Sequence, residues 1–217
     1  LLAEHGAPVQ PAQAPPAQPV VAPASSGTKD LVIGLAKEID AKNLAVFAAS
    51  LRQTTTNCDL VLFVDRPSID RTLNTIVERF QVDLVPYDPA TLQPPQLRKF
   101  HASTLRWPLI SRELDKRRSQ NYRGVLFADV RDTAFQGDPF NAMLTTQQIF
   151  YGFNGVESRT IGECGWNGGW IRDCFGEAKR RKLSSKPIVC SGVSVATFEE
   201  GRLYAAQMAE VVSDAQF

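Results

Sequence analysis

This sequence of 217 residues lacks three features, and each absence excludes a class of function. No stretch approaches the roughly 20 consecutive apolar residues that a membrane-spanning helix requires. Lys and Arg (24) nearly balance Asp and Glu (23), so the net charge is +1 and there is no basic excess for non-specific nucleic-acid binding. With two histidines and no Cys-x-x-C pair, the chain also lacks the ligand pattern of a zinc site. We therefore expect a globular domain with no nucleic-acid partner.

Residues 1–24 differ from the rest in composition, with six Pro, seven Ala and three Gln. Such a segment buries too little apolar surface to offset the entropy of ordering the chain. We therefore expect residues 1–28 to be a disordered linker or stem, followed by a domain over residues 29–217. One interpretation is the stem of a lumenal enzyme with its membrane anchor upstream of Leu1, and the alternative is an ordinary linker or a cloning remnant.

The remaining chain alternates apolar runs with helical patterns. The predicted strands are residues 31–36, 60–64, 82–87, 124–128 and 188–196. Helical spacing is clearest at Leu44, Phe47, Ala48 and Leu51, which fall at i, i+3, i+4 and i+7. A second long helical region covers residues 97–117, with a break expected at Pro108. This rhythm predicts an α/β, Rossmann-like fold, a mostly parallel sheet flanked by helices, with ligands bound beyond the carboxyl ends of the strands.

The strongest chemical signal is the segment 123–140, RGVLFADVRDTAFQGDPF. A buried strand delivers Asp129 and Asp132 at its carboxyl end, and carboxylates there suit Mg²⁺ or Mn²⁺ bridged to substrate phosphates. The alternative is structural, with Asp129 capping a turn and Asp132 pairing with Arg131 or starting a short helix.

This segment resembles the nucleotide-sugar site of GT-A-fold glycosyltransferases, in which Asp-x-Asp follows an apolar strand and Asp-Pro-aromatic follows later. Asp129 matches the first Asp of that motif, and DPF at 138–140 matches the later element. The sequence departs from the motif at Arg131, which stands where the second Asp is expected, with Asp132 one place later. The resemblance implies Mg²⁺ or Mn²⁺ held by Asp129 and Asp132, or Arg131 offsetting the charge of the diphosphate.

The resemblance also covers the first two predicted strands, whose ends hold the nucleoside in this family. It implies donor-binding roles for Lys37, Glu38 and Asp65. Arg98 and Arg106 stand where the family often keeps a basic residue for the diphosphate. The alternative for each of these two arginines is an ordinary solvated charge on a helix.

The second half of the chain is rich in glycine, and residues 152–176 hold half of its 14 glycines. We interpret NGVESRTIGECGWNGGW as a loop in which Trp166 and Asn167 contact a sugar acceptor, the alternative being that the tryptophan rings cover the core. Further on, Ser191, Gly192 and Val193 resemble the element that lines the sugar pocket of GT-A enzymes.

Two of the four cysteines, Cys164 and Cys174, flank this glycine-rich segment. A disulfide between them would close a short loop and would indicate an oxidising compartment. The alternative is free thiols in a reducing cytosol. With the expected stem, a disulfide favours the Golgi or secretory-pathway lumen, and cytoplasmic location is the alternative.

These features lead to three functional hypotheses. The first, implied by the resemblance, is a glycosyltransferase that moves a hexosyl or pentosyl group from a nucleotide sugar to a carbohydrate or glycoconjugate acceptor. The second is a catalytically silent module that binds a nucleotide sugar. The third is a haloacid-dehalogenase-type phosphatase, which also places Asp after an apolar strand, although its strand normally comes first. No residue stands out as the catalytic base, and we expect the catalytic domain to continue beyond Phe217.

Overall fold

The computed structural model describes residues 28–65, 71–141, 150–152, 159–189 and 192–214. Its strands are β1 (Asp30–Leu35), β2 (Cys58–Asp65), β3 (Val82–Tyr87), β4 (Gly124–Asp129), β5 (Phe150–Gly152) and β6 (Val193–Thr197). Its α-helices are α1 (Ala41–Thr54), α2 (Arg71–Phe80), α3 (Ala102–Lys116), α5 (Gly165–Phe175), α6 (Glu177–Leu183) and α7 (Phe198–Asp214). Short 3₁₀ helices cover Pro89–Thr91, Pro95–Lys99 and Arg118–Gln120. The expected linker, apart from residue 28, lies outside the described residues.

The strands form one sheet in the order β3-β2-β1-β4-β6-β5. The first four are parallel, whereas β6 runs antiparallel to both β4 and β5. The prediction of an α/β fold with a mostly parallel sheet is therefore confirmed. Because the parallel strands all end at one edge, the residues after β1, β2 and β4 meet there.

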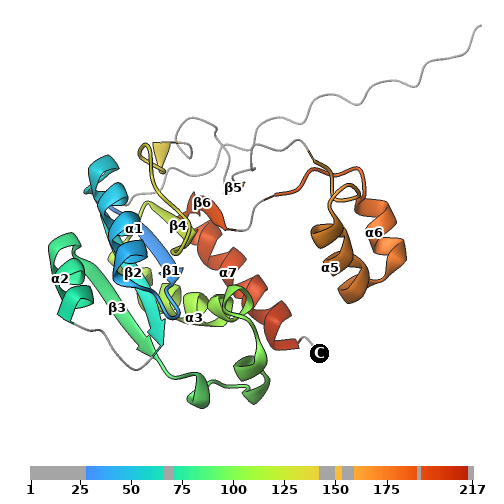
Figure 1. Ribbon diagram of the computed structural model, residues 1–217, viewed down its shortest axis with the longest axis horizontal. Helices are drawn as coiled ribbons and strands as arrows, with labels where there is room; N and C mark the ends of the chain where they lie inside the picture. The colour runs from blue at the N-terminus through green and yellow to red at the C-terminus, as the bar shows by residue number, and fades with distance from the viewer. Residues whose placement is uncertain (1–27, 66–70, 142–149, 153–158, 190–191, 215–217) are drawn as a thin grey trace, which may run out of the picture.

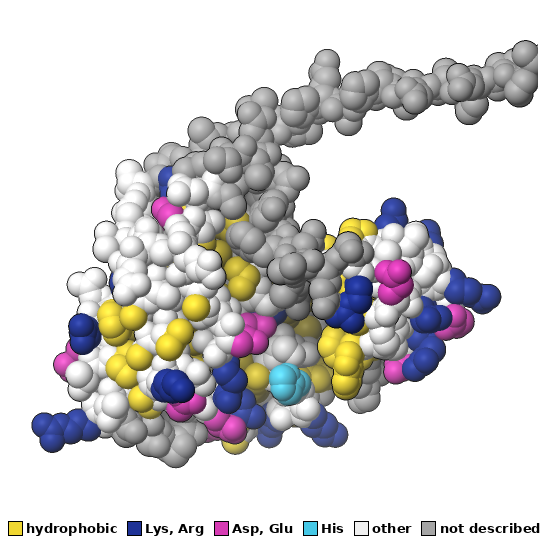
Figure 2. All heavy atoms as spheres, turned by 45° about the horizontal axis from the view of Figure 1, so that its top comes forward, with side chains coloured by type: hydrophobic (Ala, Val, Ile, Leu, Met, Phe, Trp, Pro, Cys, Tyr) yellow, Lys and Arg dark blue, Asp and Glu magenta, His cyan; other side chains and the backbone are white. Residues whose placement is uncertain are grey.

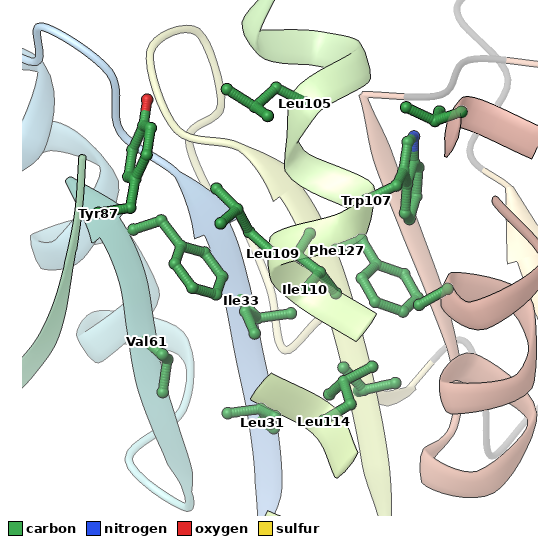
Figure 3. Close-up of a cluster of buried hydrophobic side chains, with 14 of the residues drawn as sticks. Leu31, Ile33, Val61, Tyr87, Leu105, Trp107, Leu109, Ile110, Leu114 and Phe127 are labelled. Atoms are coloured by element: carbon green, nitrogen blue, oxygen red, sulfur yellow. The ribbon is translucent and has the colours of Figure 1, made fainter. Parts of the chain in front are cut away.

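Helices cover both faces of the sheet (Figure 1). On one face α3 and α7 pack over β1, β2 and β4, and Figure 3 shows Ile33, Trp107 and Phe127 within this cluster. On the other face α1 buries the predicted stripe of Leu44, Phe47, Ala48 and Leu51. Burial on both faces explains why β1, β2 and β4 are continuous apolar runs in the sequence.

The predicted break at Pro108 is wrong, because α3 is continuous from Ala102 to Lys116 with Pro108 inside it. Proline removes one backbone donor from a helix. Here its neighbours Trp107, Leu109 and Ile110 are all buried in the cluster beneath α3, and this packing holds the helix together across the missing hydrogen bond.

The centre of the sheet depends on a glycine in β1. A β-carbon added to Gly34 would lie 2.6 Å from the carbonyl oxygen of Ala128 and 2.8 Å from Cγ2 of Val130. No side chain fits between β1 and β4 at this point. Gly34 therefore sets the close approach of the two strands whose ends carry Lys37 and Asp129.

Helices α5 and α6 pack on each other and stand apart from the sheet (Figure 1). The predicted loop is wrong here, because Gly165–Phe175 is a helix capped by Cys164. A β-carbon on Gly168 would lie 2.9 Å from the carbonyl oxygen of Ile161 and 3.3 Å from Nε of Arg180. Close packing, and not a loop, accounts for this glycine. None of the described helices is long and apolar enough to cross a membrane.

Candidate active site

A cavity of about 390 Å³ opens at the carboxyl edge of the sheet, beside the ends of β1 and β4. Its polar lining comes from Lys37, Glu38, His101, Ser103, Arg106, Asp129, Arg131 and Asp132. Six of the predicted site residues, Lys37, Glu38, Arg106, Asp129, Arg131 and Asp132, are therefore brought together in one place. Lys37 follows β1, Asp129 ends β4, and the first turns of α3 complete the wall, since a helix that follows a parallel strand begins at this edge.

Arg106 of α3 and Asp129 of β4 form an ion pair within this cavity. The Arg106 side chain is 4% exposed, whereas that of Asp129 is 44% exposed. Arg106 was predicted to bind the diphosphate. The structure gives its guanidinium a protein partner instead, so its positive charge is already balanced.

Burial raises the pKa of Asp129 above its usual value, and the negative charge of nearby Asp132 acts in the same direction. The positive charges of Arg106 and His101 oppose this shift without cancelling it. Asp132 is exposed and forms no hydrogen bond or ion pair with the described residues. Two carboxylates that repel each other at the mouth of a cavity favour the binding of a cation.

Among the described residues, Arg131 forms no ion pair with either of these carboxylates, although it lines the same cavity. Its Nη2 donates hydrogen bonds to the carbonyl oxygens of Lys37 and Glu38, at 3.2 Å each. The prediction that Arg131 meets a diphosphate remains untested, but in this structure its guanidinium holds the turn after β1. The Lys37 ammonium lies 3.8 Å from Oε1 of Glu38, and its side chain is 44% exposed.

The side chains of His101 and Ser103, which line the cavity, were missed by the sequence analysis. Nδ1 of His101 lies 2.9 Å from Oγ of Ser103 and also accepts the backbone N–H of Ser103 at 3.3 Å, so His101 caps α3. The available signal was a polar residue directly before a helix that follows a parallel strand. It was hidden because α3 was expected to begin near residue 97.

Tyr87, at the end of β3, was also not singled out from the sequence, and it lies outside the lining of the cavity. It is 7% exposed, and its hydroxyl forms no hydrogen bond with the described residues. Burial, with the charges of Asp65 and Glu38, raises the pKa of Tyr87 to about 12. The hydroxyl therefore stays protonated at this edge of the sheet (Figure 3).

Two predicted donor-binding residues do not line the cavity. Asp65 lies next to it, where its Oδ1 accepts the backbone N–H of Glu38 at 2.9 Å. Nε of Arg98 donates to the carbonyl oxygen of Leu92 at 3.3 Å, which stabilises the loop before α3.

The predicted sugar-pocket element lies beside the end of β4. The carbonyl oxygen of Gly192 accepts the backbone N–H of Asp129 at 2.7 Å, and Val193 pairs with Ala128. Ser191 lies outside the described residues. The position of Gly192 is compatible with the predicted role, which stays a prediction.

Trp166 and Asn167 do not reach the cavity, because both lie on α5. Trp166 is 74% exposed and Trp170 is 59% exposed, so neither ring covers the core. Figure 2 shows a group of hydrophobic side chains on the inner side of the lobe that holds α5 and α6, with Lys and Arg side chains beside it and on the outer side.

The predicted disulfide between Cys164 and Cys174 is wrong, since both are free thiols. Cys164 caps the start of α5 and Cys174 lies near its end. A helix rises about 1.5 Å per residue, which places their α-carbons about 15 Å apart. A disulfide requires less than about 7 Å.

The carboxylates at the cavity suit a metal site in which the protein supplies only two ligands. Among the described residues, no three His, Cys, Asp or Glu side chains come together in a way that could hold a metal ion. Asp129 and Asp132 form a set of two carboxylates. Mg²⁺ and Mn²⁺ are commonly bound by such a pair, with water and substrate phosphates as the other ligands.

No family model and no curated protein sequence matches this chain. Among solved structures, the apo form of the bifunctional glycosyltransferase WbbM matches with a TM-score of 0.52 and 14% identity, over 88% of this chain and 35% of its own. The chain has the GT-A glycosyltransferase fold. It spans about a third of the WbbM chain.

Two further structures match with TM-scores below 0.5. The Mn/GDP form of core-mannan synthase A (CmsA/Ktr4) from Aspergillus fumigatus has a TM-score of 0.48 and 11% identity, over 88% of this chain and 67% of its own. The galactosyltransferase LgtC, in complex with donor and acceptor sugar analogues, has a TM-score of 0.46 and 11% identity, over 86% of this chain and 66% of its own. At these identities the likeness to solved structures extends to the GT-A fold alone.

Proposed function

We propose that this chain is the nucleotide-sugar-binding part of a glycosyltransferase. It moves a hexosyl or pentosyl group from a nucleotide-diphosphate donor to the hydroxyl of a carbohydrate or glycoconjugate acceptor. The observation that carries the proposal is the cavity that gathers Lys37, Asp129 and Asp132 at the carboxyl edge of a GT-A sheet. Ligands of open α/β sheets bind at this edge.

The charges of the cavity suit a departing diphosphate. Negative charge develops on the leaving group as its bond to the sugar breaks, and nearby positive charge stabilises that state. A Mg²⁺ or Mn²⁺ ion held by Asp129 and Asp132 would supply such charge. Lys37 supplies more from the protein, because its ammonium lines the same cavity. Arg106 holds Asp129 from the buried side, which fixes the carboxylate relative to the donor.

Nucleotide binding tests this proposal first. We expect either UDP or GDP to raise the melting temperature in the presence of Mn²⁺ or Mg²⁺, and EDTA to remove most of the shift. Asp132→Asn should weaken binding at least about tenfold, because it removes the charge of one of the two carboxylates proposed to hold the metal. The variant should stay folded, because Asp132 is exposed and leaves no buried partner. Glu78→Gln, an exposed carboxylate on α2, is the matched control. Equal binding by wild type and Asp132→Asn would contradict the metal role.

The second candidate is a catalytically silent module that binds a nucleotide sugar. The Arg106–Asp129 ion pair favours this candidate, because Arg106 occupies one of the two oxygens that Asp129 could offer to a metal. Turnover separates the two candidates. A transferase releases nucleoside diphosphate from a nucleotide sugar, slowly to water and faster with an acceptor. Binding without release of the diphosphate from any of a panel of UDP- and GDP-sugars would favour the silent module. The phosphatase hypothesis gains no support from a GT-A fold in which the Asp-bearing strand comes fourth.

A further inference from the structure

The turn between β1 and α1 forms one wall of the cavity and has a strained backbone. Glu38 has a φ of 49°, in the left-handed region that side chains with a β-carbon disfavour. Glycine adopts this conformation freely, yet glutamate occupies the position. Such strain persists only where the surrounding structure holds it in place.

Contacts from two other strands hold this turn. Asp65, at the end of β2, accepts the backbone N–H of Glu38 at 2.9 Å. Arg131, just after β4, donates from one terminal nitrogen to the carbonyl oxygens of Lys37 and Glu38, at 3.2 Å each. The Lys37–Glu38 peptide is therefore hydrogen-bonded at both ends: its N–H donates to the Asp65 carboxylate, and its C=O accepts from the Arg131 guanidinium.

The three cations that line the cavity are engaged by the protein to different degrees. Both N–H groups of Arg131 Nη2 are used by backbone carbonyls. Arg106 is paired with Asp129. Lys37 makes only a loose contact, at 3.8 Å, with the carboxylate of Glu38. Of the three cations, Lys37 therefore makes the longest contact with a protein acceptor, while Arg131 keeps the N–H groups of Nε and Nη1.

We propose that Arg131 is a positioning residue. Arg131 fixes Glu38 in its left-handed conformation. This conformation of the turn directs the Lys37 ammonium into the cavity, where the ammonium meets the diphosphate of the donor. The direction of Lys37 toward a donor rests on the proposed function, whereas the bracing of the turn does not. On this view, Asp129 and Asp132 form the carboxylate pair, and Arg131, which directly precedes Asp132, braces the turn after β1.

Hydrogen–deuterium exchange of the nucleotide-free protein tests the bracing. We expect the peptide covering residues 36–40 to exchange at least about fivefold faster in Arg131→Ala than in wild type, since the turn loses two hydrogen bonds to a charged donor. Arg181→Ala, an exposed arginine on α6, is the matched control and should leave this peptide unchanged. Wild-type exchange in Arg131→Ala would overturn the proposal.

A double-mutant cycle separates bracing from general loosening. Glu38→Gly relieves the strain at its source, because glycine accepts a positive φ. Arg131→Ala should therefore accelerate exchange less in the Glu38→Gly background than in wild type. Independent, additive effects of the two substitutions would contradict the proposal.

Nucleotide affinity tests the role of Lys37. We expect Lys37→Met to weaken binding of UDP or GDP about tenfold while the ligand-free turn exchanges as in wild type, and Arg131→Ala to change both. If Arg131→Lys keeps full affinity although its turn exchanges as fast as in Arg131→Ala, the site needs charge at residue 131 and the proposal fails. If wild type binds neither nucleotide, the proposed function fails, and the exchange results still decide the bracing.

Discussion

Arg106 and Asp129 form an ion pair in which the cation is buried and the anion is half exposed, with side chains that are 4% and 44% accessible. The guanidinium reaches Asp129 from α3, beneath the cavity, through one carboxylate oxygen. The exposed part of the carboxylate faces the cavity. This asymmetry makes Arg106 a support for Asp129, and it leads to two predictions about that residue.

The first prediction concerns the loss of the Asp129 side chain. Asp129→Ala removes the carboxylate that pairs with the buried Arg106 guanidinium, and breaking a fully buried pair costs about 3–5 kcal/mol. Because Asp129 is half exposed, we expect a decrease of about 2 kcal/mol in the free energy of unfolding, measured by urea denaturation. Asp132→Ala, which removes an exposed carboxylate, should change it by less than about 0.5 kcal/mol. Equal effects of the two variants would contradict the supporting role of Arg106.

The second prediction concerns pH. Because its pKa is raised in the folded chain, Asp129 binds its proton more tightly there than in the unfolded chain. The stability that it contributes is therefore present at low pH and is lost as the pH rises above about 4, through the folded-state pKa. Asp129→Asn stays neutral and still offers Arg106 an oxygen, so it should not lose this stability. The free energy of unfolding of Asp129→Asn minus that of wild type should therefore increase between pH 4 and pH 7. A constant difference between the two proteins over this range would rule out the raised pKa.

The architecture could be predicted from the sequence because its signals are local. Parallel strands that are buried on both faces are apolar throughout, so the burial of a residue such as Val61 can be predicted. The apolar stripe of α1 follows from helical geometry, so the burial of Phe47 can be predicted as well. Asp129 was predicted from its place at the end of such a strand, and Lys37 from the resemblance to GT-A enzymes. His101 was missed because α3 was expected to begin near residue 97, so the residue that caps its actual start was not recognised.

The errors arose where packing overrode composition. Glycine content predicted a loop around Trp166, but Gly168 is required by the close approach of Ile161 and Arg180 inside a short helical unit. The direction of the Arg131 side chain could not be predicted, because its acceptors are backbone carbonyls 94 and 93 residues away in the sequence.

The third prediction concerns the thiols. Burial raises the pKa of Cys58 to about 11, so at pH 8 almost none of it is thiolate. Cys174 is exposed and free. In native protein at pH 8, alkylation followed by peptide mapping should therefore label Cys174 quickly and Cys58 only after denaturation. Recovery of a peptide that joins Cys164 to Cys174 under non-reducing conditions would contradict the arrangement of α5.

The fourth prediction concerns the strand that carries the strained turn. Gly34→Ala places a β-carbon 2.6 Å from the carbonyl oxygen of Ala128 and 2.8 Å from Val130, and the backbone oxygen cannot move aside as a flexible side chain would. Overpacking of this kind costs about 1–3 kcal/mol. We expect a loss within that range in the free energy of unfolding, measured by urea denaturation.

The same substitution should also weaken nucleotide binding, because separation of β1 from β4 moves Lys37 away from Asp129. Gly169→Ala is the matched control, since a β-carbon there meets no atom within 4 Å and alanine favours the helix. It should leave stability and binding unchanged or raise stability slightly. If Gly34→Ala lowers stability but the protein, at a temperature where it is still folded, binds UDP or GDP as wild type does, then the spacing of β1 and β4 does not set the geometry of the cavity.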